Sequence, residues 1–132
     1  MSEDLTQWML RINAAFNRDG IEAVIDDYHP ELEWHLPPQW LEDSVYTGHD
    51  GLRTLAALWT RNFDEYRWDI ERIVDLGQRA VLLVYHRGRT KDEGVRVEQP
   101  LGLILQIRDD KIGRVDTFFS WPEALVAAGV ED

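Results

Sequence analysis

The sequence predicts an α+β fold, in which a curved antiparallel sheet forms a cone-shaped body with three helices from the first half of the chain. Residues 79–119 contain long runs of strand-forming residues joined by short polar turns, the pattern of a strongly curved antiparallel sheet. The first half instead carries apolar side chains at helical spacing. A cone of this kind has one hollow end, so the sequence predicts a pocket.

Two helices are expected before the first strand. Residues 2–18 are expected to form the first, with Ser2 as N-cap and Gly20 as the residue that ends it. A short second helix is expected over residues 21–28, ending before Pro30 because proline cannot continue a helix. The stripe that the first helix buries is predicted to consist of Leu5, Trp8, Met9, Ile12 and Phe16.

A short strand and a third helix follow. Residues 32–36 alternate between apolar and polar side chains, which predicts a half-buried strand that ends at Pro37. Residues 39–46 are expected to form an irregular loop, and residues 47–51 a turn into the third helix, with Asp50 as its cap. The buried stripe of this helix is predicted to consist of Leu52, Leu55, Ala56, Trp59 and Phe63.

The second half of the chain is expected to form four strands, at residues 66–76, 79–90, 95–108 and 111–119. A tight turn at Asp109 and Asp110 joins the last two. Ser120 and Glu123 have the spacing of a capping box, which predicts a short C-terminal helix that ends at Gly129.

Composition limits the classes of function. The chain of 132 residues is expected to form one domain, residues 1–132, with enough hydrophobic content for a core. Its 25 acidic and 14 basic residues give a net charge of −11, which disfavours nucleic acid and anionic membranes as partners. The chain has no cysteine, which excludes disulfides and thiolate metal sites and fits a cytoplasmic location.

Two of the expected strands are apolar on both faces. In residues 80–86 and 101–107 nearly every position is hydrophobic, whereas a sheet covered by helices on one side alternates. The outer face of the sheet is therefore expected to be covered as well. Because few helices are predicted, a second copy of the chain is the expected cover, which predicts a homodimer through the sheet.

The chain resembles the nuclear-transport-factor-2-like superfamily, and within it the SnoaL-like and ketosteroid-isomerase-like branch. The resemblance covers nearly the whole chain and rests on the order of the elements and on the segments DDYHPELEWHLPP, YTGHDGLRTL, GVRVEQPLGLILQIRDDKIGRV and PEALVAAG. It implies an α+β cone with an apolar pocket, usually in a homodimer. The superfamily includes isomerases, dehydratases, epoxide hydrolases, polyketide cyclases and members without known activity, so fold alone does not set the function.

Few catalytic residues of the family carry over. Where ketosteroid isomerases have a basic aspartate before a proline in the first strand, this chain has Leu36. Cyclases and epoxide hydrolases use an acid near the middle of the last strand, where the candidates are Asp116 and Thr117. A shift of one residue in strand register decides which of the two faces the pocket. Epoxide hydrolases also carry an arginine and an aspartate on a neighbouring strand, where this chain has Arg87 and Arg89.

Three titratable residues are candidates for catalysis. Asp116 is the best single acid, because burial on an apolar strand raises the pKa of a carboxyl group. His35 and His86 are candidate bases, although strand alternation points His35 away from its tryptophan neighbour. His86 lies on one face of its strand and the pair Tyr85 and Arg87 on the other, so only one of these sets faces the pocket.

Other side chains are candidates for binding a ligand. Trp34 and Trp59 lie on apolar stripes and are expected to form the pocket wall or the core beside it. Gln99 and Thr117 can orient a hydroxyl or carbonyl group, and Tyr85 with Arg87 can hold an oxyanion. The four histidines lack the close spacing of a metal site, so neither a metal nor another cofactor is expected.

The sequence supports three hypotheses of function. The first is a binding protein for a small apolar molecule, without assignable chemistry. The second is a cofactor-independent isomerase, cyclase, dehydratase or hydrolase that uses Asp116 with His35 or His86. The third is a dimeric interaction module whose own tryptophans fill the pocket. The polar side chains that face the cavity should discriminate among them, because an enzyme needs two or more convergent titratable groups.

Overall fold

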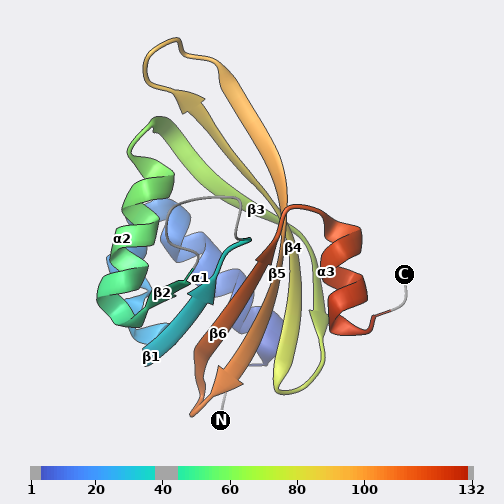
Figure 1. The fold of residues 1–132 in the computed structure, drawn as a ribbon. Coiled ribbons are helices and arrows are strands. Elements are labelled where there is room, and N and C mark those ends of the chain that lie inside the picture. Colours follow the sequence, from blue (N-terminus) through green and yellow to red (C-terminus); the bar gives the residue numbers. More distant parts are fainter. Residues whose placement is uncertain (1–3, 38–44, 131–132) are drawn as a thin grey trace.

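The computed structural model describes residues 4–37 and 45–130. Its strands are β1 (Tyr28–His35), β2 (Val45–Thr47), β3 (Phe63–Asp75), β4 (Arg79–Thr90), β5 (Arg96–Arg108) and β6 (Lys111–Phe118), and its α-helices are α1 (Leu5–Asp19), α2 (Gly48–Thr60) and α3 (Trp121–Ala128). The strands form one curved sheet in the order β2-β1-β6-β5-β4-β3, with α1 and α2 on one side and α3 on the other (Figure 1). The expected α+β architecture is confirmed.

The helices differ from expectation at their ends. Asp4 caps α1 by accepting a hydrogen bond from the backbone N–H of Gln7 at 2.8 Å, and the expected cap, Ser2, lies outside the described residues. The expected cap of α2 is wrong, because Thr47 occupies the N-cap position and Asp50 lies in the first turn. Ser120 caps α3, as expected. No described helix is long and apolar enough to cross a membrane.

The second helix expected from the sequence is wrong. The chain forms two 3₁₀ turns there, Ile21–Ala23 and Ile25–Asp27, and Tyr28 already belongs to β1. Pro30 lies inside that strand and does not end a helix. The strand begins early because Tyr28 pairs with Ile112 of β6, a contact between residues far apart in sequence. Long-range pairing has overridden the local helical pattern.

The sheet is mixed, which corrects the expectation of a purely antiparallel one. β1 runs parallel to β6, with Trp34 opposite Val115 and His35 opposite Asp116, whereas all other neighbouring strands are antiparallel. A parallel pair needs a long connection, and here α2 and the four strands β2, β3, β4 and β5 supply it. The expected loop 39–46 ends in the short strand β2, and residues 38–44 lie outside the described part.

The sheet has two apolar faces with different covers. The face toward α1 and α2, here called the inner face, carries the main core, including Leu82, Val84, Leu101, Leu103 and Leu105. The opposite, outer face carries a second cluster in which α3 covers strands β4 and β5. This cluster contains Val81, Leu83, Ile104, Ala124, Leu125 and Ala128. The chain's own α3 therefore covers much of the apolar outer face for which a second copy was expected.

Candidate functional site

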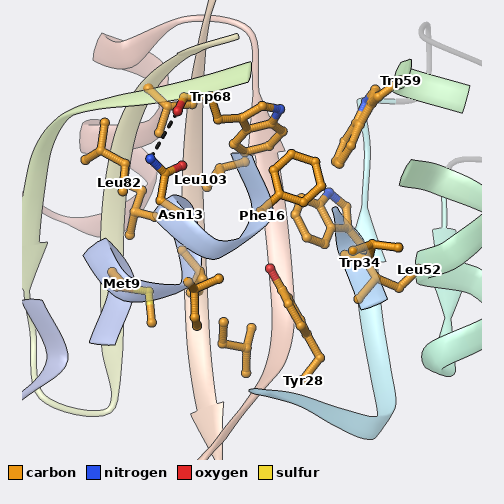
Figure 2. Close-up of a pocket in the computed structure, with 16 residues that line it drawn as sticks. Met9, Asn13, Phe16, Tyr28, Trp34, Leu52, Trp59, Trp68, Leu82 and Leu103 are labelled. Atoms are coloured by element: carbon orange, nitrogen blue, oxygen red, sulfur yellow. Dashed lines mark hydrogen bonds between the residues drawn. The ribbon is translucent and has the colours of Figure 1, made fainter. Parts of the chain in front are cut away.

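A cavity lies between α1 and the inner face of the sheet (Figure 2). Its volume is about 60 Å³. Side chains from both helices and from five strands line it, and almost all are apolar or aromatic. They are Met9, Ile12, Asn13, Phe16, Ile21, Tyr28, Trp34, Leu52, Trp59, Trp68, Ile70, Leu82, Val84, Leu103, Leu105 and Ile112. Apolar lining with few polar groups is typical of a site for a small organic molecule.

Three tryptophans from three elements form the aromatic wall of the cavity. The ring centroid of Trp59 in α2 lies 5.2 Å from that of Trp34 in β1 and 5.1 Å from that of Trp68 in β3. Trp34 and Trp68 are 6.4 Å apart and meet edge to face. Aromatic rings stabilise one another at such separations beyond the burial of their area. The wall is therefore a rigid surface on which a flat apolar ligand can pack.

α1 is fixed to the edge strand β3 through the backbone of Trp68. The side-chain amides of Asn13 and Asn17 both donate to the Trp68 carbonyl, at 3.0 and 2.7 Å, and Asn17 accepts from the Trp68 N–H at 2.9 Å. These bonds satisfy peptide groups that an edge strand leaves unpaired. They also hold the Asn13 side chain at the cavity wall (Figure 2).

The Tyr28 hydroxyl is the polar group that points into the cavity (Figure 2). The Tyr28 side chain is buried, yet its hydroxyl makes no hydrogen bond to any residue that the structure describes. Burial, with a smaller contribution from Asp27, raises the pKa of Tyr28 well above its usual value. The hydroxyl therefore stays protonated and can donate a hydrogen bond to a ligand.

A partly buried chain of hydrogen bonds connects Trp68 to side chains that do not line the cavity. The Trp68 indole N–H donates to the Tyr66 hydroxyl at 2.7 Å, and the hydroxyl lies 2.9 Å from Nδ1 of His86. Nε2 of His86 lies 2.9 Å from Oε1 of Gln99. All these contacts are satisfied when His86 is neutral with its proton on Nε2. Burial lowers the pKa of His86, against an opposing effect of the Gln99 hydrogen bond.

Of the residues proposed from the sequence, Trp34 and Trp59 line the cavity. Thr117 lies on the inner face, where its hydroxyl accepts a hydrogen bond from the Trp34 indole N–H at 2.9 Å, but it does not line the cavity. His86 and Gln99 do not line the cavity, and the His86 ring contacts Trp68. Thr117 therefore orients Trp34 and would not itself contact a ligand in the cavity.

Asp116 and His35 lie side by side on the outer face, away from the cavity. Asp116 accepts two hydrogen bonds from Arg114, at 3.0 and 3.1 Å. His35 lies 3.0 Å from a carboxylate oxygen of Glu33. Neither Asp116 nor His35 reaches the cavity, because their inner-face neighbours Val115 and Trp34 occupy that side of the strands.

Tyr85 and Arg87 also lie on the outer face. The Tyr85 ring packs against Trp121 of α3 at 4.8 Å, and the Arg87 guanidinium lies 4.9 Å from the Tyr85 ring centroid. Arg87 bonds to Asp69 and Glu98. The alternation of β4 therefore sends His86, and not this pair, to the inner face.

Sequence reasoning missed three residues of the site: Tyr28, Asn13 and Trp68. Tyr28 falls within the helix expected over residues 21–28 but lies in β1, and Asn13 is a polar residue beside the apolar stripe of α1. Trp68 had a usable signal, because it alternates with Tyr66 and Ile70 in the expected strand 66–76. Among residues 4–37 and 45–130, no group of histidines and carboxylates is arranged to hold a metal ion.

Comparisons with known proteins identify relatives of this architecture. A model of the SnoaL-like domain matches residues 9–115. The structure of TerC co-crystallized with polyporic acid is 21% identical, with a TM-score of 0.73 and 94% of each chain covered. An NTF2-like protein of unknown function from Burkholderia pseudomallei is 18% identical, with a TM-score of 0.73 and coverage of 92% of this chain and 94% of that chain.

A third similar structure is a hypothetical protein from Catenulispora acidiphila that has a ketosteroid isomerase-like fold and was solved in complex with trimethylamine. It is 14% identical, with a TM-score of 0.72 and coverage of 93% of this chain and 92% of that chain. At these identities the likeness shows the fold alone. No curated protein matches the chain.

Proposed function

The chain belongs to the SnoaL-like domain family, and on this premise we propose that it binds a small, largely apolar molecule in the cavity beside α1. The observation that carries the proposal is the hydroxyl of the buried Tyr28 side chain, which has no hydrogen-bond partner among the described residues and is directed into an aromatic cavity (Figure 2). A hydroxyl that faces an apolar cavity without a protein partner is free to donate, so a ligand that accepts its hydrogen bond is favoured there.

The chemistry of the lining defines the class of ligand. The Trp34, Trp59 and Trp68 rings favour a flat or compact apolar body, and the Tyr28 hydroxyl favours an oxygen acceptor at one end. A ketone, ether or phenol has both features. Similar structures were solved with polyporic acid and with trimethylamine, which supports the binding of small organic molecules by this fold.

Binding of all but the smallest ligands requires side chains to move. The cavity of about 60 Å³ is smaller than the roughly 300–1,000 Å³ of a pocket for a drug-sized molecule. A groove of about 540 Å³ between α1 and α2 shares two lining residues with the cavity, Phe16 and Ile21. Rotation of these two side chains would join the groove to the cavity, which makes them the access route in this proposal.

Tryptophan fluorescence tests the proposal. Apolar ketones and phenols should quench or shift the emission of the wild-type protein in a saturable way. Tyr28→Phe should weaken an oxygen-bearing ligand roughly two- to tenfold, the effect of losing one neutral hydrogen bond, and leave a hydrocarbon of the same shape unchanged. Tyr85→Phe is the matched control, because Tyr85 lies on the outer face.

Two outcomes would count against the proposal. A panel of apolar ligands that leaves the fluorescence unchanged would favour the interaction module, whose pocket its own tryptophans fill. Equal weakening of binding by Tyr28→Phe and Tyr85→Phe would show that the hydroxyl in the cavity does not contact the ligand.

We prefer binding over a cofactor-independent enzyme because the titratable candidates do not converge on the cavity. Asp116 and His35 lie on the outer face, and His86 contacts the Trp68 ring but does not line the cavity. An enzyme of the proposed kind needs an acid or base within hydrogen-bond reach of its substrate. Among the described residues that line the cavity, only Tyr28 is titratable, and its raised pKa keeps it neutral.

The homodimer stays a prediction. Because α3 already covers Val81, Leu83 and Ile104, the apolar pattern that motivated the dimer is partly satisfied within one chain. The remaining outer-face surface, which includes Tyr85 and Trp121, is the part available for a second copy. Light scattering at micromolar concentration should give about twice the mass of the 15.4 kDa chain, and the mass of a monomer would refute the dimer.

A further inference from the structure

A second hollow lies on the outer face, where the β4–β5 hairpin extends beyond the rest of the fold (Figure 1). Its volume is about 300 Å³. It is lined by Glu65, Arg67, Arg87, Gly88, Arg89, Arg96, Val97 and Glu98. In a chain of net charge −11, a gathering of four arginines around one hollow is an unusual local excess of positive charge.

Two of these arginines are neutralised by neighbouring acids. Asp69 accepts hydrogen bonds from both Arg67 and Arg87, and Glu98 accepts from Arg87 Nε at 2.6 Å. Burial opposes ionisation of Asp69, but its hydrogen bonds from Arg67 and Arg87 outweigh that effect and lower its pKa. Because Asp69 and Glu98 already accept hydrogen bonds from Arg67 and Arg87 and balance their charge, these two arginines are poor binding groups for a further anion.

Of the other two arginines, Arg89 has only a long ion pair with Glu65, and no acid pairs with Arg96 among the described residues. Arg89 lies directly opposite Arg96 in the register of β4 and β5, two residues beyond the pair Arg87 and Glu98 and therefore on the same face. Like charges directly opposite each other destabilise a pair of strands. The pair of Arg87 with Glu98 is matched in charge, whereas the next pair on this face, Arg89 with Arg96, is positive on both strands. An anion bound between Arg89 and Arg96 would therefore stabilise the hairpin.

The hydrogen-bonding groups of these two side chains are also unused. The nearest acid to Arg89 is Glu65, whose carboxylate lies 3.8 Å from Nη2, beyond hydrogen-bond distance. Nε of Arg89 is buried and has no acceptor. Arg96 makes no hydrogen bond or ion pair to any residue within 4–37 or 45–130. The guanidinium groups of both residues thus keep their planar donor sets free.

We propose that Arg89 and Arg96 form a binding site for an oxyanion, a carboxylate or a phosphate, on the outer face of the β4–β5 hairpin. An oxyanion between them would relieve the repulsion of the opposed charges and accept from both guanidinium groups. Arginine suits this role because its planar donors match the geometry of carboxylate and phosphate oxygens. The site is distinct from the cavity, which lies on the inner face of the sheet.

Calorimetric titration with two probes tests the site, with inorganic phosphate and acetate compared at constant ionic strength. The wild-type protein should bind at least one of them saturably. Arg89→Gln and Arg96→Gln should each weaken that binding at least tenfold, and Arg89→Lys, which keeps the charge without the planar donors, should weaken it less. Arg61→Gln is the matched control, because it removes one positive charge from the exposed end of α2 and should leave the affinity unchanged.

Light scattering on the same samples separates two sources of the oxyanion. If neither probe binds, and a wild-type dimer dissociates in both glutamine variants but not in Arg61→Gln, the oxyanion is a side-chain carboxylate of a second copy. Saturable binding that both glutamine variants retain would overturn the proposal. So would a wild-type protein that binds neither probe and whose mass does not change in the variants. Circular dichroism spectra like that of the wild type establish that each variant is folded.

Discussion

Gly102→Ala tests how α3 packs on the outer face of the sheet. Gly102 lies in β5 beneath α3, and a Cβ atom built on it would lie 2.4 Å from Cβ of Ala124. Ordinary contacts of this kind begin at 3.4 Å, so α3 must move by 3.4 − 2.4, about 1 Å, to accommodate the methyl group. The carbonyl oxygen of Ser120, the N-cap of α3, is a second obstacle at 3.4 Å, which restricts the direction of that movement.

The expected cost is that of overpacking a tight interface, about 1–3 kcal/mol. Gly102 does not have a positive φ, so its backbone conformation suits alanine and the cost is steric. Alanine also restricts the unfolded chain, which offsets about 0.4–1 kcal/mol of the destabilisation. For a chain of 132 residues, each net kcal/mol should lower Tm by roughly 3–5 °C.

Urea denaturation of the single and double variants measures the effect. Ala124→Gly removes the methyl group that the new side chain meets, at a cost of about 1 kcal/mol for glycine inside a helix. If the steric argument is right, Gly102→Ala with Ala124→Gly should be more stable than the sum of the two single effects by at least about 1 kcal/mol. Additive effects, or a Gly102→Ala protein as stable as the wild type, would refute the predicted contact. Ligand binding in the cavity should not change, because Gly102 faces α3.

Three further predictions concern the polar residues. Because burial lowers the pKa of His86, against the opposing Gln99 hydrogen bond, the unfolded chain binds its proton more readily. Wild-type stability should therefore fall as pH drops below about 6.5, by at most about 1.4 kcal/mol per pH unit, and urea titrations of His86→Gln should lack this part of the slope. Thr117→Val should cost about 1–3 kcal/mol in urea denaturation, because it leaves the buried Trp34 N–H without its acceptor, whereas Thr117→Ser should retain most of the stability. Asp116→Asn should change stability by less than about 1 kcal/mol and leave ligand affinity unchanged, since its ion pair with Arg114 is on the outer face; a large loss of affinity would return Asp116 to the site.

The elements that sequence reasoning located correctly are those with a strong local pattern. Four residues of the expected stripe, Leu52, Leu55, Ala56 and Trp59, are buried in α2, because helical spacing alone decides which face of a helix is apolar. The fifth, Phe63, was wrong, since α2 ends at Thr60 and Phe63 begins β3. The strand pairing of β1 with β6 was not predictable in this way. It joins residues some eighty positions apart, and no local signal distinguishes a parallel neighbour from an antiparallel one.

The site was predicted less completely than the fold. Alternation placed Trp34 on the inner face because the residues on either side of it, Glu33 and His35, are polar. On β4 the same reasoning left two answers open, since Val81 and Leu83 on one face are as apolar as Leu82 and Val84 on the other. The position of α3 decides between the two faces. Its apolar side covers Val81 and Leu83, so Leu82 and Val84 line the cavity.

The position of Asp116 is decided by an irregularity in the pairing of β5 with β6. Asp109 and Asp110 both have positive φ values, 53° and 63°, the conformation of a tight hairpin turn, and the register of β5 and β6 shifts between Gln106 and Ile107. After this irregularity Thr117 pairs with Leu103 of the inner face and Asp116 with Ile104 of the outer face. Without it, each side chain of β6 would take the opposite face. Gly113 is the extra residue, because Ile107 pairs with Ile112 and Gln106 with Arg114. The chemistry that the cavity can hold therefore depends on a local irregularity in β6, a few residues before Asp116.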